Sequence, residues 1–179
     1  MIYGSSKVSR EVRMTRKIAL VGPHGTGKTT LAEKLGKILE LPVLPEIARE
    51  ALVRSKVSWR VIATVKPLYK LWEATLYEAI LEMHRRDMFF VADRSLVDVV
   101  AYTEAILGPG AVAEMFPDWK EDVRSIGYSA LVYCGKPYSE QVDGVWVRVN
   151  KALRTMLQTL EADEVVRVIW LEEGDEGTL

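Results

Sequence analysis

The chain has 179 residues, of which 49% are hydrophobic and 27% are charged, and its formal net charge is -1. This size and composition suit one well-buried core, so we expect a single domain. The nearly balanced charge excludes a whole-protein attraction to nucleic acid or to an anionic membrane, and no apolar run is long enough to span a bilayer. One cysteine, Cys134, and two histidines, His24 and His84, provide neither a disulfide framework nor a Cys/His zinc site. We therefore expect a cytoplasmic protein that binds neither nucleic acid nor membrane, with Cys134 as a core thiol.

The first residues are basic. They carry Lys7, Arg10, Arg13, Arg16 and Lys17 against only Glu11. We expect residues 1–16 to form a flexible, solvated arm, residues 1–13 being a flexible extension or lying ahead of a start at Met14, and residues 17–179 to form the domain.

Residues 22–30 read G-P-H-G-T-G-K-T-T, between the apolar run 18–21 and a helical pattern. This is the sequence and context of a phosphate-binding loop (P-loop), in which backbone N–H groups of a glycine-rich turn converge on phosphate oxygens. The lysine of the motif reaches the β and γ phosphates and the threonine after it ligates Mg²⁺. The predicted nucleotide contacts are Gly22, His24, Gly25, Thr26, Gly27, Lys28, Thr29 and Thr30. The alternative is a glycine-rich turn with a chance Lys-Thr pair.

Downstream, short β-type runs alternate with helical patterns, which predicts an α/β fold with a parallel sheet covered on both faces. A helix carries Leu31, Leu35, Ile38 and Leu39 on its buried face and ends at Leu41-Pro42, and apolar positions from Trp59 recur at helical spacing in two pieces separated near Pro67. Further helices are expected over 96–107, over 111–125 and around 153–160. The expected strands are 18–21, 43–44, 88–92, 131–134 and 165–171.

Polar residues follow the strands, at the sheet edge where ligands of such folds bind. Asp93 ends a buried strand and is the predicted carboxylate on the Mg²⁺ side, with Thr29 as the other metal ligand; the alternative is a helix N-cap. Glu46 is the candidate base for an acceptor hydroxyl, or else an acid favoured by the first turn of a helix. Arg49 and Arg94 are predicted to hold the acceptor, unless they pair with Glu50 or Asp98.

Basic residues recur at three-residue steps in Arg148, Lys151 and Arg154, after a loop with Gly135, Pro137 and Gly144 as hinges. This pattern predicts a lid around residues 136–148, in which Arg148 stabilises the transferring phosphoryl group. The alternative is a solvated basic face. Lys28, Glu46, Asp93 and Arg148 are thus the predicted catalytic residues.

Four segments together resemble the phosphate-loop nucleoside and nucleotide kinases, and among them the AAA-like kinases that include the ribosylnicotinamide kinase domain. They are G-P-H-G-T-G-K-T-T, L-P-V-L-P-E-I-A-R-E, F-F-V-A-D-R-S-L-V-D-V-V-A-Y and D-G-V-W-V-R. The resemblance implies a P-loop NTPase fold with a five-stranded parallel sheet, ATP with Mg²⁺, and phosphoryl transfer to a nucleoside-like alcohol or a nucleoside monophosphate. In deoxynucleoside kinases a base and an acceptor-binding arginine fall at the positions of Glu46 and Arg94. Those kinases have Glu-Arg-Ser where this chain has Asp93-Arg94-Ser95, a form closer to thymidylate kinases, so acceptor identity stays open.

Other classes of P-loop protein fit less well. The chain has no D-x-x-G segment, and Asn150-Lys151-Ala152-Leu153 lacks the acid of a guanine reader, which argues against a GTPase switch. Arg94 stands where a motor ATPase would place a glutamate. A P-loop ATPase and a non-catalytic ATP-binding regulatory module remain alternatives, ATP and GTP remain open as donors, and the abundant aromatics could support a homodimer.

Overall fold

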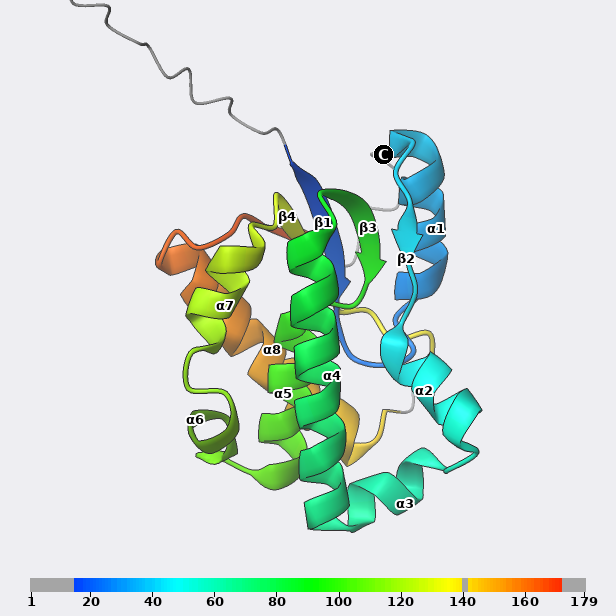
Figure 1. The fold of residues 1–179 in the computed structure, drawn as a ribbon, viewed down its shortest axis with the longest axis vertical. Helices are drawn as coiled ribbons and strands as arrows, with labels where there is room; N and C mark the ends of the chain where they lie inside the picture. Colours follow the sequence, from blue (N-terminus) through cyan, green and yellow to red (C-terminus); the bar gives the residue numbers. More distant parts are fainter. Residues whose placement is uncertain (1–14, 140–141, 172–179) are drawn as a thin grey trace, which may run out of the picture.

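A five-stranded parallel sheet forms the centre of the protein in a computed structural model that describes residues 15–139 and 142–171 (Figure 1). The strand order is β2-β3-β1-β4-β5. The strands are β1 (Arg16–Val21), β2 (Val43–Leu44), β3 (Phe89–Asp93), β4 (Ala130–Cys134) and β5 (Val168–Leu171). The predicted α/β class with five parallel strands is confirmed.

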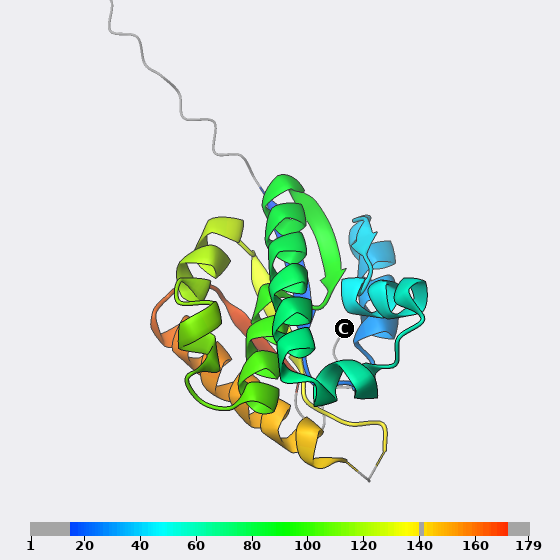
Figure 2. The ribbon, with the colours of Figure 1, turned by 60° about the horizontal axis from the view of Figure 1, so that its bottom comes forward.

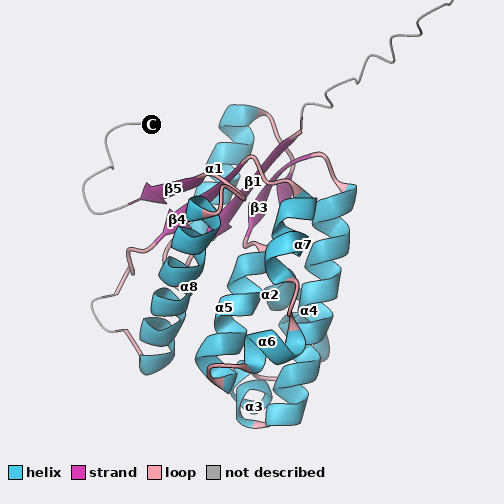
Figure 3. Cartoon of the chain, turned by 90° about the vertical axis from the view of Figure 1, so that its left-hand side faces the viewer, coloured by secondary structure: helices cyan, strands magenta, loops and turns pink. Residues whose placement is uncertain are grey.

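The sheet lies between two unequal helical layers (Figure 3). On one face, Leu20, Val91 and Val132 pack with Ala32 of α1. On the other, the alternate strand residues pack against α4, α5, α7 and α8, as the two-residue period of a strand requires. The helices α2 and α3 lie to one side of α4 (Figure 2). The helices are α1 (Lys28–Leu39), α2 (Ile47–Ser55), α3 (Trp59–Thr64), α4 (Lys66–Arg86), α5 (Leu96–Leu107), α6 (Ala111–Met115), α7 (Trp119–Ile126) and α8 (Gly144–Ala162).

The strand register sets the position of the functional residues. Leu20 of β1 pairs with Asp93 of β3, and Val21 pairs with Tyr133 of β4. The loop that follows Val21 therefore emerges between the ends of β3 and β4, and residues after all three strands can meet there.

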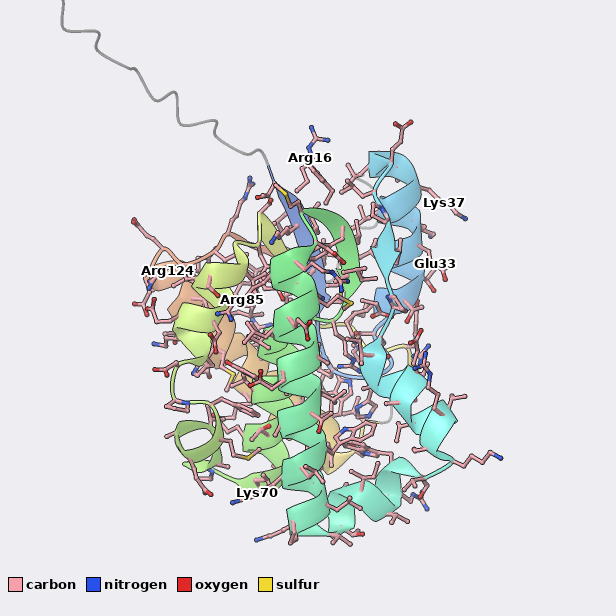
Figure 4. All side chains as sticks on the ribbon, in the orientation of Figure 1. Arg16, Glu33, Lys37, Lys70, Arg85 and Arg124 are labelled. Atoms are coloured by element: carbon pink, nitrogen blue, oxygen red, sulfur yellow. The ribbon has the colours of Figure 1, made fainter. Side chains whose placement is uncertain are left out.

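The helix α1 shows how local sequence dictates packing. Leu31 and Leu35 turn to the sheet, whereas Glu33 and Lys37 point outward (Figure 4). Ile38 was predicted on the buried face, but it is 72% exposed. The buried face is centred on Ala32 and Gly36, and Ile38 lies roughly 140° around the helix from that centre, on the exposed side.

Two predicted boundaries need correction. The helix expected over 111–125 is two helices, α6 and α7, because Pro117 lies between them and the residue before a proline is disfavoured in helical conformation. The last strand is Val168–Leu171, so only the second part of the expected 165–171 is strand. The break near Pro67 is confirmed, since this proline lies in the first turn of α4.

The basic N-terminal segment divides in two. Residues 1–14, most of the expected arm, lie outside the described residues, but Arg16 already belongs to β1. Lys17 is buried, and its Nζ donates to the carbonyl oxygens of His84 and Ile126, both at 2.8 Å. This lysine therefore satisfies the carboxyl ends of α4 and α7, where a positive charge is favoured. Within the described residues, no helix is both long and apolar enough to cross a membrane.

Candidate functional site

The predicted phosphate-binding loop joins β1 to α1. At Gly22, a Cβ atom would collide with the carbonyl oxygen of Cys134, and at Gly27 the backbone has φ 82° directly before α1. Neither position accepts a larger residue without strain. The glycines therefore allow the tight turn that leads into the N-terminus of α1, where helical N–H groups are free for an anion.

Lys28 lies across this loop. Its Nζ donates to the carbonyl oxygen of Pro23 at 2.5 Å and to Thr26 Oγ1 at 3.1 Å. Burial, with a contribution from the charge of Arg94, lowers the pKa of Lys28 to about 8, against the opposing effect of Asp98 and then Asp93. Because this ammonium is held in the loop and poorly solvated, an anion bound beside it would strongly stabilise its charged form.

Thr29 and Asp93 meet as predicted for metal ligands. The Thr29 hydroxyl donates to Asp93 Oδ2 at 2.6 Å, and the buried Asp93 Oδ1 has no hydrogen-bond partner. These are hard oxygen ligands, and the free carboxylate oxygen fits Mg²⁺ held directly or through water. The described residues hold no cluster of three or more His, Cys, Asp or Glu that could bind a metal. The capping role that the sequence left open for Asp93 belongs to Ser95, the N-cap of α5.

Glu46 and Arg94 form the second part of the site. Arg94 Nε contacts Glu46 Oε1 at 2.5 Å, and its Nη1 lies 3.7 Å from Asp98 Oδ1. Arg49 Nη2 lies 3.3 Å from Glu46 Oε2, but its side chain is 65% exposed. The alternative pairing of Arg49 with Glu50 is not what the structure has, because Glu50 pairs with Arg54. The structure thus brings the predicted base and both acceptor arginines together.

The backbone of Arg94 is strained. Its φ is 95°, a region that L side chains rarely adopt, and its N–H donates to the carbonyl oxygen of Leu20 at 3.1 Å. Such strain occurs at functional sites, where it fixes a side chain in one direction. The guanidinium of this strained residue also lies 5.2 Å from the ring centre of Tyr102.

Asp98 and Tyr102 are site residues to which the sequence assigned no role. Asp98 accepts from the Gly22 N–H at 3.1 Å and from the Ser95 N–H at 2.8 Å, the latter completing a capping box. The Tyr102 hydroxyl accepts from the His24 N–H at 3.1 Å. The spacing Ser95-x-x-Asp98 was a signal for the cap, but the link to the phosphate-binding loop depends on how α5 packs.

A cavity of about 300 Å³ opens beside this site. Glu46, Asp93 and Arg94 line its end at the sheet, and Trp59 and Trp72 contribute aromatic walls. Trp59 makes edge-on ring contacts with Tyr69 and Tyr102, so its side of the cavity is a packed aromatic cluster. The cavity is large enough for a small organic molecule next to the phosphate-binding loop.

The predicted lid is attached to the loop through its described parts. Tyr138 N–H donates to the Gly25 carbonyl oxygen at 2.9 Å, and Trp146 Nε1 donates to the His24 carbonyl oxygen at 3.1 Å. Asp143 Oδ2 lies 3.6 Å from His24 Nε2 and its other carboxylate oxygen caps α8. Residues 140 and 141 lie outside the described part of the chain.

The three basic residues predicted to form one face of the lid lie in different surroundings. Arg148 lies in the first turns of α8, and its Nε donates to the Ala105 carbonyl oxygen at 2.9 Å. Lys151 is exposed, and Arg154 lies over the rings of Tyr133 and Trp170, at 5.5 and 5.4 Å from their centres. A role for Arg148 at the phosphates therefore requires the side chain to exchange this hydrogen bond.

The comparisons with known proteins agree with this arrangement. Residues 17–162 match the AAA domain family, so the chain belongs to that family. No curated protein matches the sequence. The similar solved structures include P-loop nucleoside and small-molecule kinases, which confirms the P-loop fold.

Two of these structures are similar over most of this chain. Deoxyadenosine kinase from M. mycoides, with dCMP and dCDP bound, has a TM-score of 0.64 and 14% identity, covering 87% of this chain and 89% of its own. NadR protein in complex with NAD and AMP-PNP has a TM-score of 0.68 and 15% identity, covering 89% of this chain. The match spans only 45% of the NadR chain. At these identities the likeness establishes the fold alone.

Proposed function

We propose that this protein is an ATP- and Mg²⁺-dependent kinase that transfers the γ-phosphoryl group to a nucleoside-like alcohol or to a nucleoside monophosphate. The observation that carries the proposal is the junction of two sites: Asp93, which is hydrogen-bonded to Thr29 of the phosphate-binding loop, lines the same cavity as the Glu46–Arg94 pair. Family membership and the kinases of similar fold support it.

On the donor side, the loop amides from Gly25 to Thr30 and the N-terminus of α1 would bind the phosphates, with Gly22 and His24 beside them, and the Lys28 ammonium would bind the terminal oxygens. Thr29 and Asp93 would hold Mg²⁺, which supplies positive charge against the phosphates when bound. These groups offset the charge that develops on the phosphoryl oxygens and the leaving group.

On the acceptor side, Arg94 and Arg49 would orient the acceptor, and Glu46 would take the proton of its hydroxyl. The hydroxyl oxygen attacks the γ-phosphorus, the bond from that phosphorus to the β–γ bridging oxygen breaks, and ADP leaves. The hydroxyl proton passes to Glu46. Arg148 would neutralise the transferring group when the segment around residues 136–148 closes.

The test is ADP release from ATP and Mg²⁺ with and without a panel of nucleosides, ribosylnicotinamide and nucleoside monophosphates. A kinase releases ADP only when an acceptor is present, and the phosphorylated acceptor appears in equal amount. Steady release without acceptor would instead identify an ATPase. Binding of ATP without turnover under any condition would identify a regulatory module.

A further inference from the structure

One acidic residue of the cavity wall has no role in the proposed reaction. Glu73 lies on α4 between the aromatic and apolar residues Tyr69, Trp72 and Leu76, and it is 2% exposed. Its Oε2 is buried and has no hydrogen-bond partner. A buried carboxyl oxygen without a partner is costly, so it requires an explanation beyond packing.

The surroundings of Glu73 keep it largely neutral. Burial raises the pKa of its carboxyl to about 8, although the Tyr69 hydroxyl and then the Arg94 guanidinium act in the opposite direction. At neutral pH the group is mostly the protonated acid, which can both donate and accept a hydrogen bond. Its terminal torsion is soft, so the carboxyl group can turn to a molecule in the cavity.

A second polar group beside it also has no partner. Trp72 Nε1, on the same helix, is buried without a hydrogen bond, and both Trp72 and Glu73 line the cavity. Two adjacent unpaired groups lie buried in one wall, and a rotation of their side chains would offer a donor and a donor-acceptor to a molecule in the cavity. A donor and a donor-acceptor side by side can form hydrogen bonds with the polar atoms along the edge of a flat ring.

The charges of the cavity restrict the ligand further. Among the described residues that line it, five are acidic and one is arginine: Glu46, Glu73, Asp93, Asp98, Asp143 and Arg94. Arg94 is already paired with Glu46 and lies close to Asp98. Arg94 is the one arginine or lysine among these lining residues, so a phosphate carried into this space by the acceptor would find no unpaired cation.

We propose that Glu73, assisted by the Trp72 indole N–H, determines the acceptor specificity of this protein, and that the acceptor is an unphosphorylated nucleoside-like alcohol whose ring edge both donates and accepts hydrogen bonds. The inference rests on the proposed kinase function and narrows its acceptor to the nucleoside class. Glu73 acts at the end of the acceptor remote from the reacting hydroxyl, where it contributes to binding and not to bond breaking.

The experiment compares wild type with Glu73→Leu, Glu73→Gln and, as a matched control on the exposed face of α4, Glu82→Leu. Adenosine, guanosine, cytidine and uridine, and their 5′-monophosphates, are tested as acceptors by ADP release. In parallel, calorimetry measures the binding of the same compounds without ATP. The thermal midpoint of each variant checks that it is folded.

We expect wild type to use one or more nucleosides at least tenfold better, in kcat/KM, than the corresponding monophosphates. Glu73→Leu should raise the KM for the best nucleoside about tenfold or more while the KM for ATP is unchanged, because it removes hydrogen bonds to the acceptor alone. Glu73→Gln, which mimics the neutral acid, should restore most of the binding, and Glu82→Leu should behave as wild type.

Several outcomes would overturn the inference and leave the kinase function intact. These are a preference for the monophosphates, an unchanged acceptor KM in Glu73→Leu, or an equal loss in Glu82→Leu. If nucleosides bind with an affinity that depends on Glu73 but no compound is phosphorylated, the ligand-reading role of Glu73 is supported and the kinase function fails. Absence of binding and turnover with every compound overturns both.

Discussion

The proposed donor and acceptor halves of the site are formed by different parts of the fold. Around the phosphate-binding loop the contacts are made by backbone groups and by side chains from adjacent strand ends, such as Lys28 with Pro23 and Thr29 with Asp93. Around the cavity the walls are side chains from helices that lie beyond the sheet, including Trp59, Trp72 and Glu73. The first half is fixed by the sheet register, whereas the second depends on how α3 and α4 pack. For the proposed kinase, this difference places the donor site on the sheet and assigns acceptor choice to the helices of the cavity.

The largest effect is expected on the donor side, from Lys28→Ala. Its ammonium is buried in the loop, and loss of such a charge at the transferring phosphates should lower kcat by about 10³ or more. The exposed Lys37 of the same helix gives the control Lys37→Ala, which should retain wild-type rates. Stopped-flow or coupled ADP assays with folded protein measure the difference. Near-normal kcat in Lys28→Ala would show that Lys28 does not act on the transferring phosphates.

The junction between the halves is tested by Glu46→Gln. The variant keeps the shape of the side chain but cannot take a proton, so kcat should fall by about 10² while the KM for ATP stays within a few-fold of wild type. Glu50→Gln, in the first turn of the same helix and paired with Arg54, is the matched control. An unchanged kcat in Glu46→Gln would return Glu46 to a purely structural pairing with Arg94.

The sequence was most informative where function depends on local geometry. The glycine-rich turn, Lys28 and Thr29 are contiguous, and Asp93 is placed beside them by the end of a strand that reads plainly as buried. The role of Ser95 as the cap of α5 was also accessible from its spacing to Asp98, although the sequence analysis assigned it to neither residue. These positions follow from a contiguous motif or from the end of a recognisable strand.

The acceptor wall could not be predicted in the same way. An acid at position 73 within an apolar helical stripe was a visible anomaly, but its meaning depends on the face that α4 turns toward the cavity. The direction of the Arg94 side chain follows from a backbone with φ 95°, which no propensity predicts. The sequence also placed Arg148 over the phosphates, whereas its hydrogen bond to Ala105 depends on the packing of α8 on α5.

Arg148→Ala tests whether the predicted lid takes part in phosphoryl transfer. If Arg148 leaves Ala105 to neutralise the transferring group, kcat should fall by about 10², and Arg148→Lys should recover part of the rate because it keeps the charge. The free energy of unfolding should change by only about 1 kcal/mol, the typical worth of one hydrogen bond. Unfolding in urea and single-turnover transfer measure the two quantities. A loss of stability with no loss of rate would show that Arg148 only joins α8 to α5.

The last effect is on stability and concerns the far end of the acceptor cavity, where His84 is buried with its Nδ1 2.6 Å from the Tyr128 hydroxyl. Burial, followed by the charge of Lys17, lowers the pKa of His84 to about 4, although Asp87 opposes this. The unfolded chain therefore binds a proton near pH 6.5 that the folded protein does not take up until about pH 4. Stability contributed by the neutral imidazole is complete above pH 6.5 and is lost as the pH falls toward 4, by about 3 kcal/mol for a shift of this size.

Urea unfolding of wild type and His84→Gln at pH 7 and pH 4.5 isolates this contribution, because the carboxylates that also titrate are common to both proteins. The free energy of unfolding should fall less steeply with acidification in His84→Gln than in wild type. Equal slopes in the two proteins would mean that His84 takes up its proton in the folded state as readily as in the unfolded chain, and that the far wall of the cavity is more open to water than its packing indicates. In that case Glu73, on the same helix, would lose the dry surroundings on which its proposed selection of the acceptor depends.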